Sequence, residues 1–588
     1  MRFASLDLVR NQWRTFTYLL DTTGSYTPIP ANSPTTINVS AVNVEENSSR
    51  LPIPYKIPPG IERVQSISNN GVNLLQNEQS MSLKINNLDN GDARAVFKTL
   101  NLDIRSYGQM SMFIHAESVI GQRTINNGEL EAVIRIGQDF LNNYYEIRIP
   151  LTITAFNSAA TAEEIWPEAN NLDFALNDLV QLKLTRNNSG APVNKIYRQV
   201  IGNKTFSVMG NPNLGEVQGY LIGIENAITG ANTPLSTEVW VDELRLSDID
   251  EHGGWAALGR VDMQLADLGT LSVSANTYTA GFGGIEQKIN ERAKNSLVQY
   301  DAALNIDLAK LLPKGLHASI PVYAGYNKTI LTPEYDPYDL DVKYKYKIQN
   351  AGDAKDSIKN VALDETTIKT LNFTNMRFGV TGKKPKIWSL SNFDFSFSYT
   401  GFSQTNPIIL DNTLRKYRGG LGYTYTSNGK FITPFKKLIK NKSTWLAPIK
   451  DFNFNYTPSL LSFRTDINRQ YGEFVPRIVN ITDKTVEQVD TSYDKFFTFD
   501  RYYNLRWDLT RTLNLDFSAV NFARVDEPIG KLNTPQKRDT VLRNFLKGGR
   551  NTLYQQRATI SYSIPFNKLP LTDWITARYS YSTTYNWI

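Results

Sequence analysis

The sequence predicts an all-β protein in which a β-sandwich is followed by long antiparallel strands of a transmembrane barrel. Aromatic residues are abundant, with 30 Tyr, 28 Phe and 9 Trp, although the mean hydropathy is −0.35. Apolar and polar residues alternate in most segments, as in strands that bury one face. After about residue 250 the alternating runs lengthen to roughly 9–14 residues, a length that crosses a bilayer at a tilt.

Residues 1–64 are expected to hold one strand and a proline-rich connection. Pro at the density of YTPIPANSP and LPIPYKIPPG suits edge strands or extended links. Residues 65–250 are expected to form a jelly-roll-like β-sandwich insertion, because their short alternating runs are spaced as in an antiparallel sandwich. The runs are SMFIHAES, ELEAVIRIG, YYEIRIPLTIT, VQLKLTR, GYLIGIENA and STEVWVDELRLSD.

Two local features interrupt this pattern. The apolar spacing of the last run breaks at Asp242-Glu243, which predicts a β-bulge. A short helix is predicted around AEEIWPEANNLDFA, where Pro167 interrupts it. No other helix is expected in the first half.

Residues 251–588 are expected to form a transmembrane β-barrel segment of about twelve strands. In the run SNFDFSFSYTG, for example, Phe393, Phe395 and Phe397 alternate with Asp394 and Ser396. The predicted strands lie near 258–266, 269–279, 296–309, 315–328, 369–381, 391–403, 415–427, 451–465, 496–509, 511–524, 553–564 and 573–588. The family resemblance described below implies that such a set is one arc of the wall of a larger barrel.

The polar face of these strands would line a wet lumen. Its charged members are Asp301, Asp307, Asp394, Arg506, Asp508, Asp516 and Arg578. Short and long connections alternate, as in outer-membrane barrels, and the basic stretch 432–450 on the short side is expected to lie along the membrane as an amphipathic segment. A soluble sandwich or propeller would also alternate, so that reading stays open at this point.

The composition argues against several kinds of chemistry. With no Cys and 3 His, the chain lacks the residues of thiolate sites and of most His-based catalytic centres. No nucleophile elbow, Walker loop or HExxH motif is present. A net charge of +6 over 588 residues is too small for a typical nucleic-acid binder. We therefore expect no enzyme activity, no catalytic, cofactor or metal residues, and no nucleic-acid partner.

Two acidic clusters leave a question about calcium, whose ligands are carboxylates and carbonyls. The first contains Asp89 and Asp92, and the second contains Asp336, Asp339 and Asp341. Neither has the spacing of a full calcium loop. Solvated turns are the favoured interpretation of both clusters.

Several long motifs resemble the SprA/Sov family. They are STEVWVDELRLSDIDEHGGWAALGRVDMQLADLGTLSVSANTYTAGFGGIEQKINER, LTPEYDPYDLDV, LPIPYKIPPGIERVQ and MSLKINNLDNGDARAVFKTLNLDIRSYGQMSMFIHAES. The resemblance implies the outer-membrane translocon of the type IX secretion system, linked to gliding motility in Bacteroidetes-like Gram-negative bacteria. It implies a very large single-chain barrel that passes folded cargo proteins to the cell surface without bond chemistry.

The partners that this resemblance implies are secreted cargo, a PorV-type outer-membrane barrel, a plug protein, periplasmic motor components and membrane lipid. We expect the chain to be a fragment, because its N-terminus lacks the apolar stretch of a signal peptide and its end falls within an alternating run. Two alternatives stay open: a surface β-rich glycan-binding protein, which would be soluble without detergent, and a TonB-dependent-type transporter, which would place a plug domain before its barrel.

Overall fold

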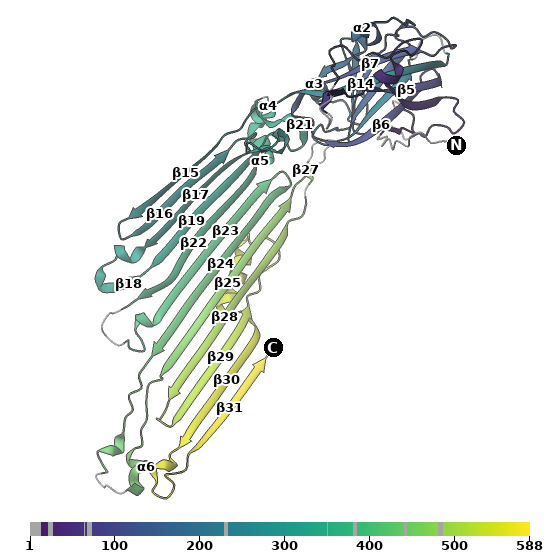
Figure 1. Cartoon of the computed structure of the whole chain (residues 1–588). Coiled ribbons are helices and arrows are strands. Elements are labelled where there is room, and N and C mark those ends of the chain that lie inside the picture. Colours follow the sequence, from purple (N-terminus) through teal and green to yellow (C-terminus); the bar gives the residue numbers. More distant parts are fainter. Residues whose placement is uncertain are drawn as a thin grey trace. The chain divides into compact units, whose positions relative to one another are not determined.

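The computed structural model describes residues 13–20, 27–63, 65–67, 73–227, 233–349, 351–379, 385–439, 444–479, 486–487 and 489–588. They form two compact units (Figure 1). The sandwich unit comprises the described residues within Met1–Gly253, Gly283–Arg292 and Glu334–Asn350. The sheet unit comprises those within Gly254–Phe282, Ala293–Pro333 and Ala351–Ile588. Both units are built from antiparallel strands, which confirms the all-β fold class.

Two antiparallel sheets form the sandwich unit. The first contains, in spatial order, β1 (Arg14–Thr15), β6 (Ala93–Leu102), β13 (Val217–Asn226), β8 (Leu130–Gly137), β9 (Tyr144–Pro150), β12 (Lys204–Met209) and β11 (Tyr197–Ile201). The second contains β10 (Leu172–Ala175), β7 (Tyr107–Ser118), β14 (Leu235–Ile249), β5 (Gln79–Leu88) and β2 (Thr36–Asn43). The alternating apolar residues of both sheets meet in one buried core, which includes Leu83, Ile134 and Val239.

One predicted strand of the sandwich is a helix. The run VQLKLTR lies within α3 (Leu176–Ser189), which ends at Gly190 in the left-handed conformation. The residues that α3 buries include Leu176, Leu179 and Leu182, which recur every three residues along one helical face. The helical spacing of the buried leucines, and not the short apolar alternation within the run, therefore determines the structure of this segment.

The two other local predictions for this unit are confirmed. A short helix, α2 (Ala162–Ile165), ends before Pro167 and begins with a capping box between Thr161 and Glu164. The register of β14 against β7 shifts between Asp242 and Arg245, and Glu243 has a φ of 50°. This bulge turns the side chain of Asp242 toward the neighbouring strand β5.

The sheet unit contains twelve antiparallel strands that neighbour one another in sequence order (Figure 1). They are β15 (Ala256–Leu265), β16 (Gly269–Tyr278), β17 (Asn295–Asp307), β19 (Pro321–Pro333), β22 (Asp364–Phe378), β23 (Phe393–Asn406), β24 (Ile409–Thr426), β25 (Leu460–Pro476), β28 (Ser492–Asp508), β29 (Leu513–Arg524), β30 (Arg550–Ile564) and β31 (Ala577–Trp587). Each predicted segment overlaps one of these strands. A two-residue strand, β18 (Ala318–Ser319), also pairs with β22.

Smaller elements occupy the connections. The short strand pairs are β3 (Gln65–Ile67) with β4 (Asn73–Leu75), β20 (Tyr335–Asp336) with β21 (Asp339–Lys343), and β26 (Ile478–Val479) with β27 (Val486–Glu487). The remaining helices are α1 (Val44–Asn47), α4 (Tyr344–Gln349), α5 (Lys355–Ala362), α6 (Ala447–Lys450) and α7 (Pro535–Leu546). None of the helices in the described part of the chain is both long enough and apolar enough to cross a membrane.

The connections at the two ends of the large sheet differ in length. Residues 279–294, 334–363, 477–491 and 525–549 join strands at one end, where β23 and β24 meet in a tight turn. The opposite end has shorter links apart from 427–459. That link contains the expected amphipathic stretch, of which residues 440–443 lie outside the described residues. Trp445 and Ile449, at its short helix α6, are more than half exposed.

Candidate functional site

The register of the large sheet separates its side chains into two faces. Residues directly opposite each other on paired strands share a face, and successive residues of a strand alternate between faces. One face, here called the polar face, includes Asp262, Ser274, Asp301, Asn327, Asn372, Asp394, Ser398, Arg418, Asn468, Asn504, Asp516, Ser561 and Ser580. The seven charged residues that the sequence assigned to a wet lumen all lie on this face.

The opposite face, here called the apolar face, includes Val261, Val273, Leu304, Phe373, Phe395, Phe397, Leu421, Phe463, Leu515, Ile560 and Tyr581. Aromatic rings pair across its strands, as for Tyr399 and Tyr417, whose centroids are 5.1 Å apart. Phe395 is 40% exposed and Tyr581 is 55% exposed in the chain. An exposed apolar surface of this extent is typical of an interface with protein or lipid.

A hollow of about 890 Å³ lies at the centre of the polar face. Gly420 and Gly422 of β24 form its floor, because a side chain at Gly422 would collide with the carboxylate of Asp394 on the neighbouring strand. Charges of both signs surround it, among them Asp466, which accepts a hydrogen bond of 2.9 Å from Nε of Arg464. The surface therefore offers an open hollow lined by charges of both signs.

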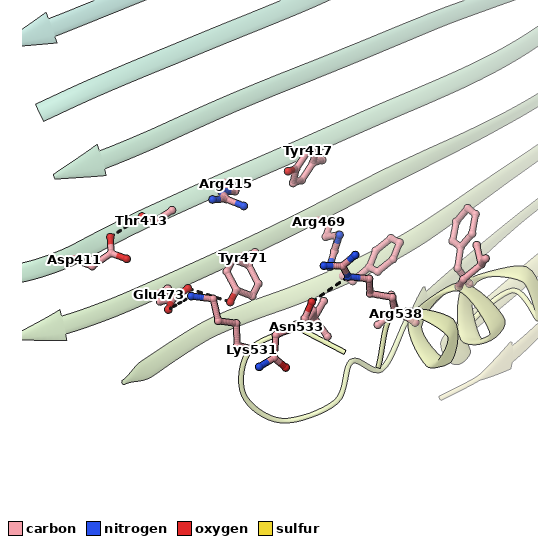
Figure 2. Close-up of a pocket in the computed structure, with 15 residues that line it drawn as sticks. Asp411, Thr413, Arg415, Tyr417, Arg469, Tyr471, Glu473, Lys531, Asn533 and Arg538 are labelled. Atoms are coloured by element: carbon pink, nitrogen blue, oxygen red, sulfur yellow. Dashed lines mark hydrogen bonds and ion pairs between the residues drawn. The ribbon is translucent and has the colours of Figure 1, made fainter. Parts of the chain in front are cut away.

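The apolar face becomes charged toward the long connections. On β24 the apolar residues Leu421 and Tyr417 are followed by Arg415, Thr413 and Asp411. Neighbouring β25 changes in the same way to Arg469, Tyr471 and Glu473. Apart from Leu421, these residues line a pocket of about 720 Å³ against the connection 525–549, shown in Figure 2.

The connection that covers this pocket is fastened by hydrogen bonds and ion pairs. Glu473 accepts from the Tyr471 hydroxyl at 3.2 Å and pairs with Lys531 at 3.1 Å (Figure 2). Nε of Arg469 donates to Glu527 at 2.6 Å. The predicted long loop is therefore an ordered part of the sheet unit, and the helix α7 within it was not predicted. The sequence nevertheless marks both ends of this helix. Thr534 before Pro535 is a start signal, and Gly548 and Gly549 after the apolar run are a stop signal.

The acidic cluster around Asp341 lies in the sandwich unit and is buried, so the interpretation as a solvated turn is wrong there. Asp341 is 5% exposed and accepts hydrogen bonds from the Tyr145 hydroxyl at 2.6 Å and the Leu214 amide at 2.6 Å. Nζ of Lys183 lies 3.0 Å from Asp341 and 2.8 Å from Asp339. Burial, together with the Asp341 carboxylate, raises the pKa of Tyr145 well above its usual value.

Lysine side chains therefore occupy the place that a calcium ion would take in this cluster. The third member, Asp336, is 2% exposed and pairs with Lys347. In the other acidic cluster Asp92 pairs with Arg94, while Asp89 is exposed in a turn as expected. Lys183 lies 158 residues from Asp341 in sequence, which is why spacing alone did not indicate this partner.

A third acidic group was missed by the sequence analysis although the bulge that creates it was predicted. The carboxylates of Glu78, Asp242 and Glu243 come within 4.8 Å of one another, an arrangement that could hold a metal ion. Ser80 donates to Asp242 at 2.9 Å, and Arg245 pairs with Glu243 at 2.7 Å. Burial, followed by the nearby Glu78, raises the pKa of Asp242 to about 8.

A comparison with protein families identifies the chain. The family model SprA_N, described as a motility related/secretion protein, matches residues 1–348, more than half of the 588 residues. The chain belongs to the SprA_N family. No curated protein matches it. The predicted relationship to the SprA/Sov family is thus confirmed, and the chain is a motility- or secretion-related protein.

The SprA_N match covers residues of both units. It includes the two sheets of the sandwich, the buried cluster around Asp341 and strands β15, β16, β17 and β19 of the large sheet. The polar and apolar faces continue beyond residue 348, through β31, although the register of β22 shifts between Phe373 and Met376. The two-faced sheet is therefore the feature of this SprA_N protein from which its function is best argued.

Proposed function

We propose that this SprA_N protein is an outer-membrane protein translocon of the type IX secretion system, and that its large sheet is a section of the wall. The proposal rests on one observation: a polar face continues over twelve neighbouring strands, with an apolar face on the opposite side of the sheet. A wall of this kind has lipid on its apolar side and water on its polar side. Folded cargo proteins would pass along the wet side to the cell surface.

Backbone hydrogen bonding supports a membrane location for the sheet. Antiparallel pairing satisfies the N–H and C=O groups of each inner strand laterally, so such strands can stand in hydrocarbon. The apolar face then contacts acyl chains through side chains such as Phe395 and Leu421. In water the same side chains would leave a large apolar surface exposed, which favours the membrane over a soluble glycan-binding role.

The polar face suits a conduit better than an enzyme. Its charges are arranged as neighbouring opposite pairs, such as Arg260 with Asp262 and Arg506 with Asp516. A wall of alternating sign holds neither acidic nor basic cargo tightly, since attraction at one point is offset by repulsion at the next. The protein's contribution would be a wet, weakly binding path, with no bond made or broken.

The proposal extends to partners. By its family relationship we propose secreted cargo proteins, a PorV-type outer-membrane barrel, a plug protein and periplasmic motor components as partners. The location would be the outer membrane of a Bacteroidetes-like Gram-negative cell. A TonB-dependent-type transporter is less well supported, because the described N-terminal unit is a β-sandwich that precedes the strands.

Single-cysteine labelling tests the proposal directly, because the chain has no native Cys. Phe395→Cys and Ser396→Cys place a thiol on the apolar and the polar face of the same strand. In outer membranes, a membrane-impermeant maleimide should label Ser396→Cys, and a lipophilic maleimide should label Phe395→Cys. A bulky maleimide at Ser396→Cys should also slow the appearance of cargo at the cell surface. Equal labelling by both reagents, or a protein that stays soluble without detergent, would contradict the proposal.

A further inference from the structure

The connection 525–549 folds back onto the apolar face of the sheet at its charged end. Val525 is 1% exposed, and its amide donates to the Phe497 carbonyl at 2.8 Å. Nη2 of Arg501 donates to the Gly548 carbonyl at 3.1 Å, which fixes the other end of the connection. Helix α7 between these points therefore has a defined position on the sheet.

Helix α7 uses one side for the sheet and leaves two leucines uncovered. Val541 is buried, and the ring of Phe545 lies 5.7 Å from that of Phe497 and 5.2 Å from that of Phe499. The leucines one position further along, Leu542 and Leu546, are 55% and 74% exposed. A helix that exposes two leucines one turn apart has an apolar stripe without a protein partner among the described residues.

The pocket beside this stripe combines apolar walls with cations. Leu542 of α7 and Tyr417 of β24 form apolar walls. Tyr417 also pairs with Tyr399 where the apolar face meets its charged end. Arg415 and Arg538 line the same space, as Figure 2 shows. The pocket is thus continuous with the surface that the proposed function assigns to lipid.

The charge balance of the pocket favours an anion. Two of its lining cations are already neutralised, since Lys531 pairs with Glu473 and Arg469 pairs with Glu527. Within the described residues Arg415 makes no ion pair, and the guanidinium of Arg538 donates only to the Leu532 carbonyl. Against these two guanidinium groups the pocket has one further carboxylate, Asp411, which accepts from the Thr413 hydroxyl at 2.7 Å.

We propose that this pocket binds the phosphate-bearing headgroup of an outer-leaflet lipid whose headgroup carries a net negative charge. Arg415 and Arg538 would hold the phosphate, because guanidinium groups pair with phosphate oxygens through two parallel hydrogen bonds. An acyl chain would run along Tyr417, Leu542 and Leu546 onto the apolar face. The inference rests on the proposed function, since it needs this face to lie in the membrane, and it adds a specific lipid site at the outer rim.

The test uses the full chain purified in a zwitterionic detergent, with bound lipid counted by native mass spectrometry. The probes are phosphatidylglycerol, lipid A, and phosphatidylcholine with acyl chains matched to the phosphatidylglycerol, together with inorganic phosphate as a competitor. We expect phosphatidylglycerol or lipid A to bind at least about tenfold more tightly than phosphatidylcholine. The double variant Arg415→Gln/Arg538→Gln should lose this preference, by about tenfold in affinity for each charge-assisted contact removed.

Arg418→Gln is the matched control, because Arg418 is an exposed arginine of the same strand on the polar face. It should bind the anionic lipid as the unaltered chain does. The variant Leu542→Ser/Leu546→Ser, at exposed positions, should weaken retention of every lipid without preference for charge. Equal losses in the Arg415→Gln/Arg538→Gln and Arg418→Gln proteins, or full displacement of lipid by millimolar inorganic phosphate, would overturn the lipid site.

Failure of this site would be distinguishable from failure of the proposed function. Labelling at Phe395→Cys and Ser396→Cys reports the two faces independently of the pocket. If those thiols are labelled as expected while the lipid preference is absent, the proposed function is supported and the lipid site is contradicted. If the labelling fails as well, the membrane assignment itself is wrong.

Discussion

The sandwich unit encloses a cluster of thirty-three buried apolar residues, whereas the enclosed cluster found in the described part of the sheet unit consists of Phe497, Val525 and Val541. Both units alternate apolar and polar residues along their strands. In the sandwich the apolar sides of two sheets cover each other. In the described part of the large sheet no second sheet covers the apolar side, and the proposed function places lipid there.

This difference implies that the two units respond to different kinds of substitution. The sandwich depends on internal partners, as a soluble domain does, and a loss inside it is measured as a lower free energy of unfolding. Under the proposed function the sheet depends on the surrounding lipid, and a substitution that disturbs its apolar face would be measured as poorer membrane integration.

The largest effect is expected from a charge buried in the sandwich. Arg135 and Glu146 are both fully buried and lie 2.7 Å apart. Glu146→Gln would leave Arg135 without its counter-charge, which should cost about 3–5 kcal/mol of unfolding free energy. Chemical unfolding followed by the fluorescence of the buried Trp166 and Trp240 measures this.

The control for that substitution lies in the sheet unit. Asp526→Asn removes the exposed partner of Arg550, and no measurable change in unfolding free energy is expected because solvent screens the pair. Similar losses at both positions would mean that the sandwich core is wetter than its packing indicates.

On the large sheet the sensitive position is the apolar face. Phe395→Arg should impair membrane integration, at a cost of about 2–4 kcal/mol if the residue lies near the bilayer midplane. Ser396→Arg, one residue further on the polar face, should integrate normally. The yield of heat-modifiable protein in outer membranes compares the two. Equal yields would remove the assignment of faces and the contrast between the units.

A smaller loss of unfolding free energy is expected from a substitution in residues 334–349, which belong to the sandwich unit. Asp341→Asn removes the charge that Lys183 and the Tyr145 hydroxyl face, and should lower the unfolding free energy by about 1–3 kcal/mol. The exposed residue Asp89 provides the matched control, Asp89→Asn, which should have no measurable effect. If the two variants unfold alike, the Asp341 cluster contributes nothing to the sandwich.

The smallest change is expected for a one-unit step in pH. Asp242 has a native pKa of about 8, raised by burial and by Glu78 from an unfolded value near 3.9. The native state therefore holds a proton that the unfolded state releases, and stability is lost as pH rises through this window, by about 1.4 kcal/mol per pH unit between about pH 5 and 7. Unfolding at several pH values should show this slope, and Asp242→Asn should abolish it. An unchanged slope in the variant would locate the proton elsewhere.

Much of the fold could be predicted from local sequence patterns. The alternation of Phe393, Phe395 and Phe397 was sufficient to predict β23 and its two faces, because the period of a strand is independent of what covers it. The break in spacing at Asp242 was likewise sufficient to predict the bulge. In α3, however, the alternation of Val180, Leu182 and Leu184 also fits part of a helical period, and the burial of Leu179 and Leu182 decides between the two.

The candidate sites depended on contacts between residues far apart in sequence. Nothing local to Asp341 indicates that Lys183 would neutralise it, since 158 residues separate the two. The pocket beside α7 has the same origin, because Arg415 comes from a strand and Leu542 from a connection much later in the chain. A sequence pattern shows which side of an element is apolar, but tertiary folding determines which element lies against it.

Under the proposed function, the length of β24 determines where cargo would leave the wall. Its 18 residues, at a rise of about 3.4 Å each and a tilt of about 40°, span roughly 45 Å along the membrane normal. An apolar band in such walls is only about 25 Å tall. If the strand begins at the inner edge of that band, about 20 Å of wall stands above the outer headgroups. A folded protein that left through this raised part of the wall would first meet open solvent beyond the headgroup layer. Its surface would therefore be shielded from lipid throughout its exit.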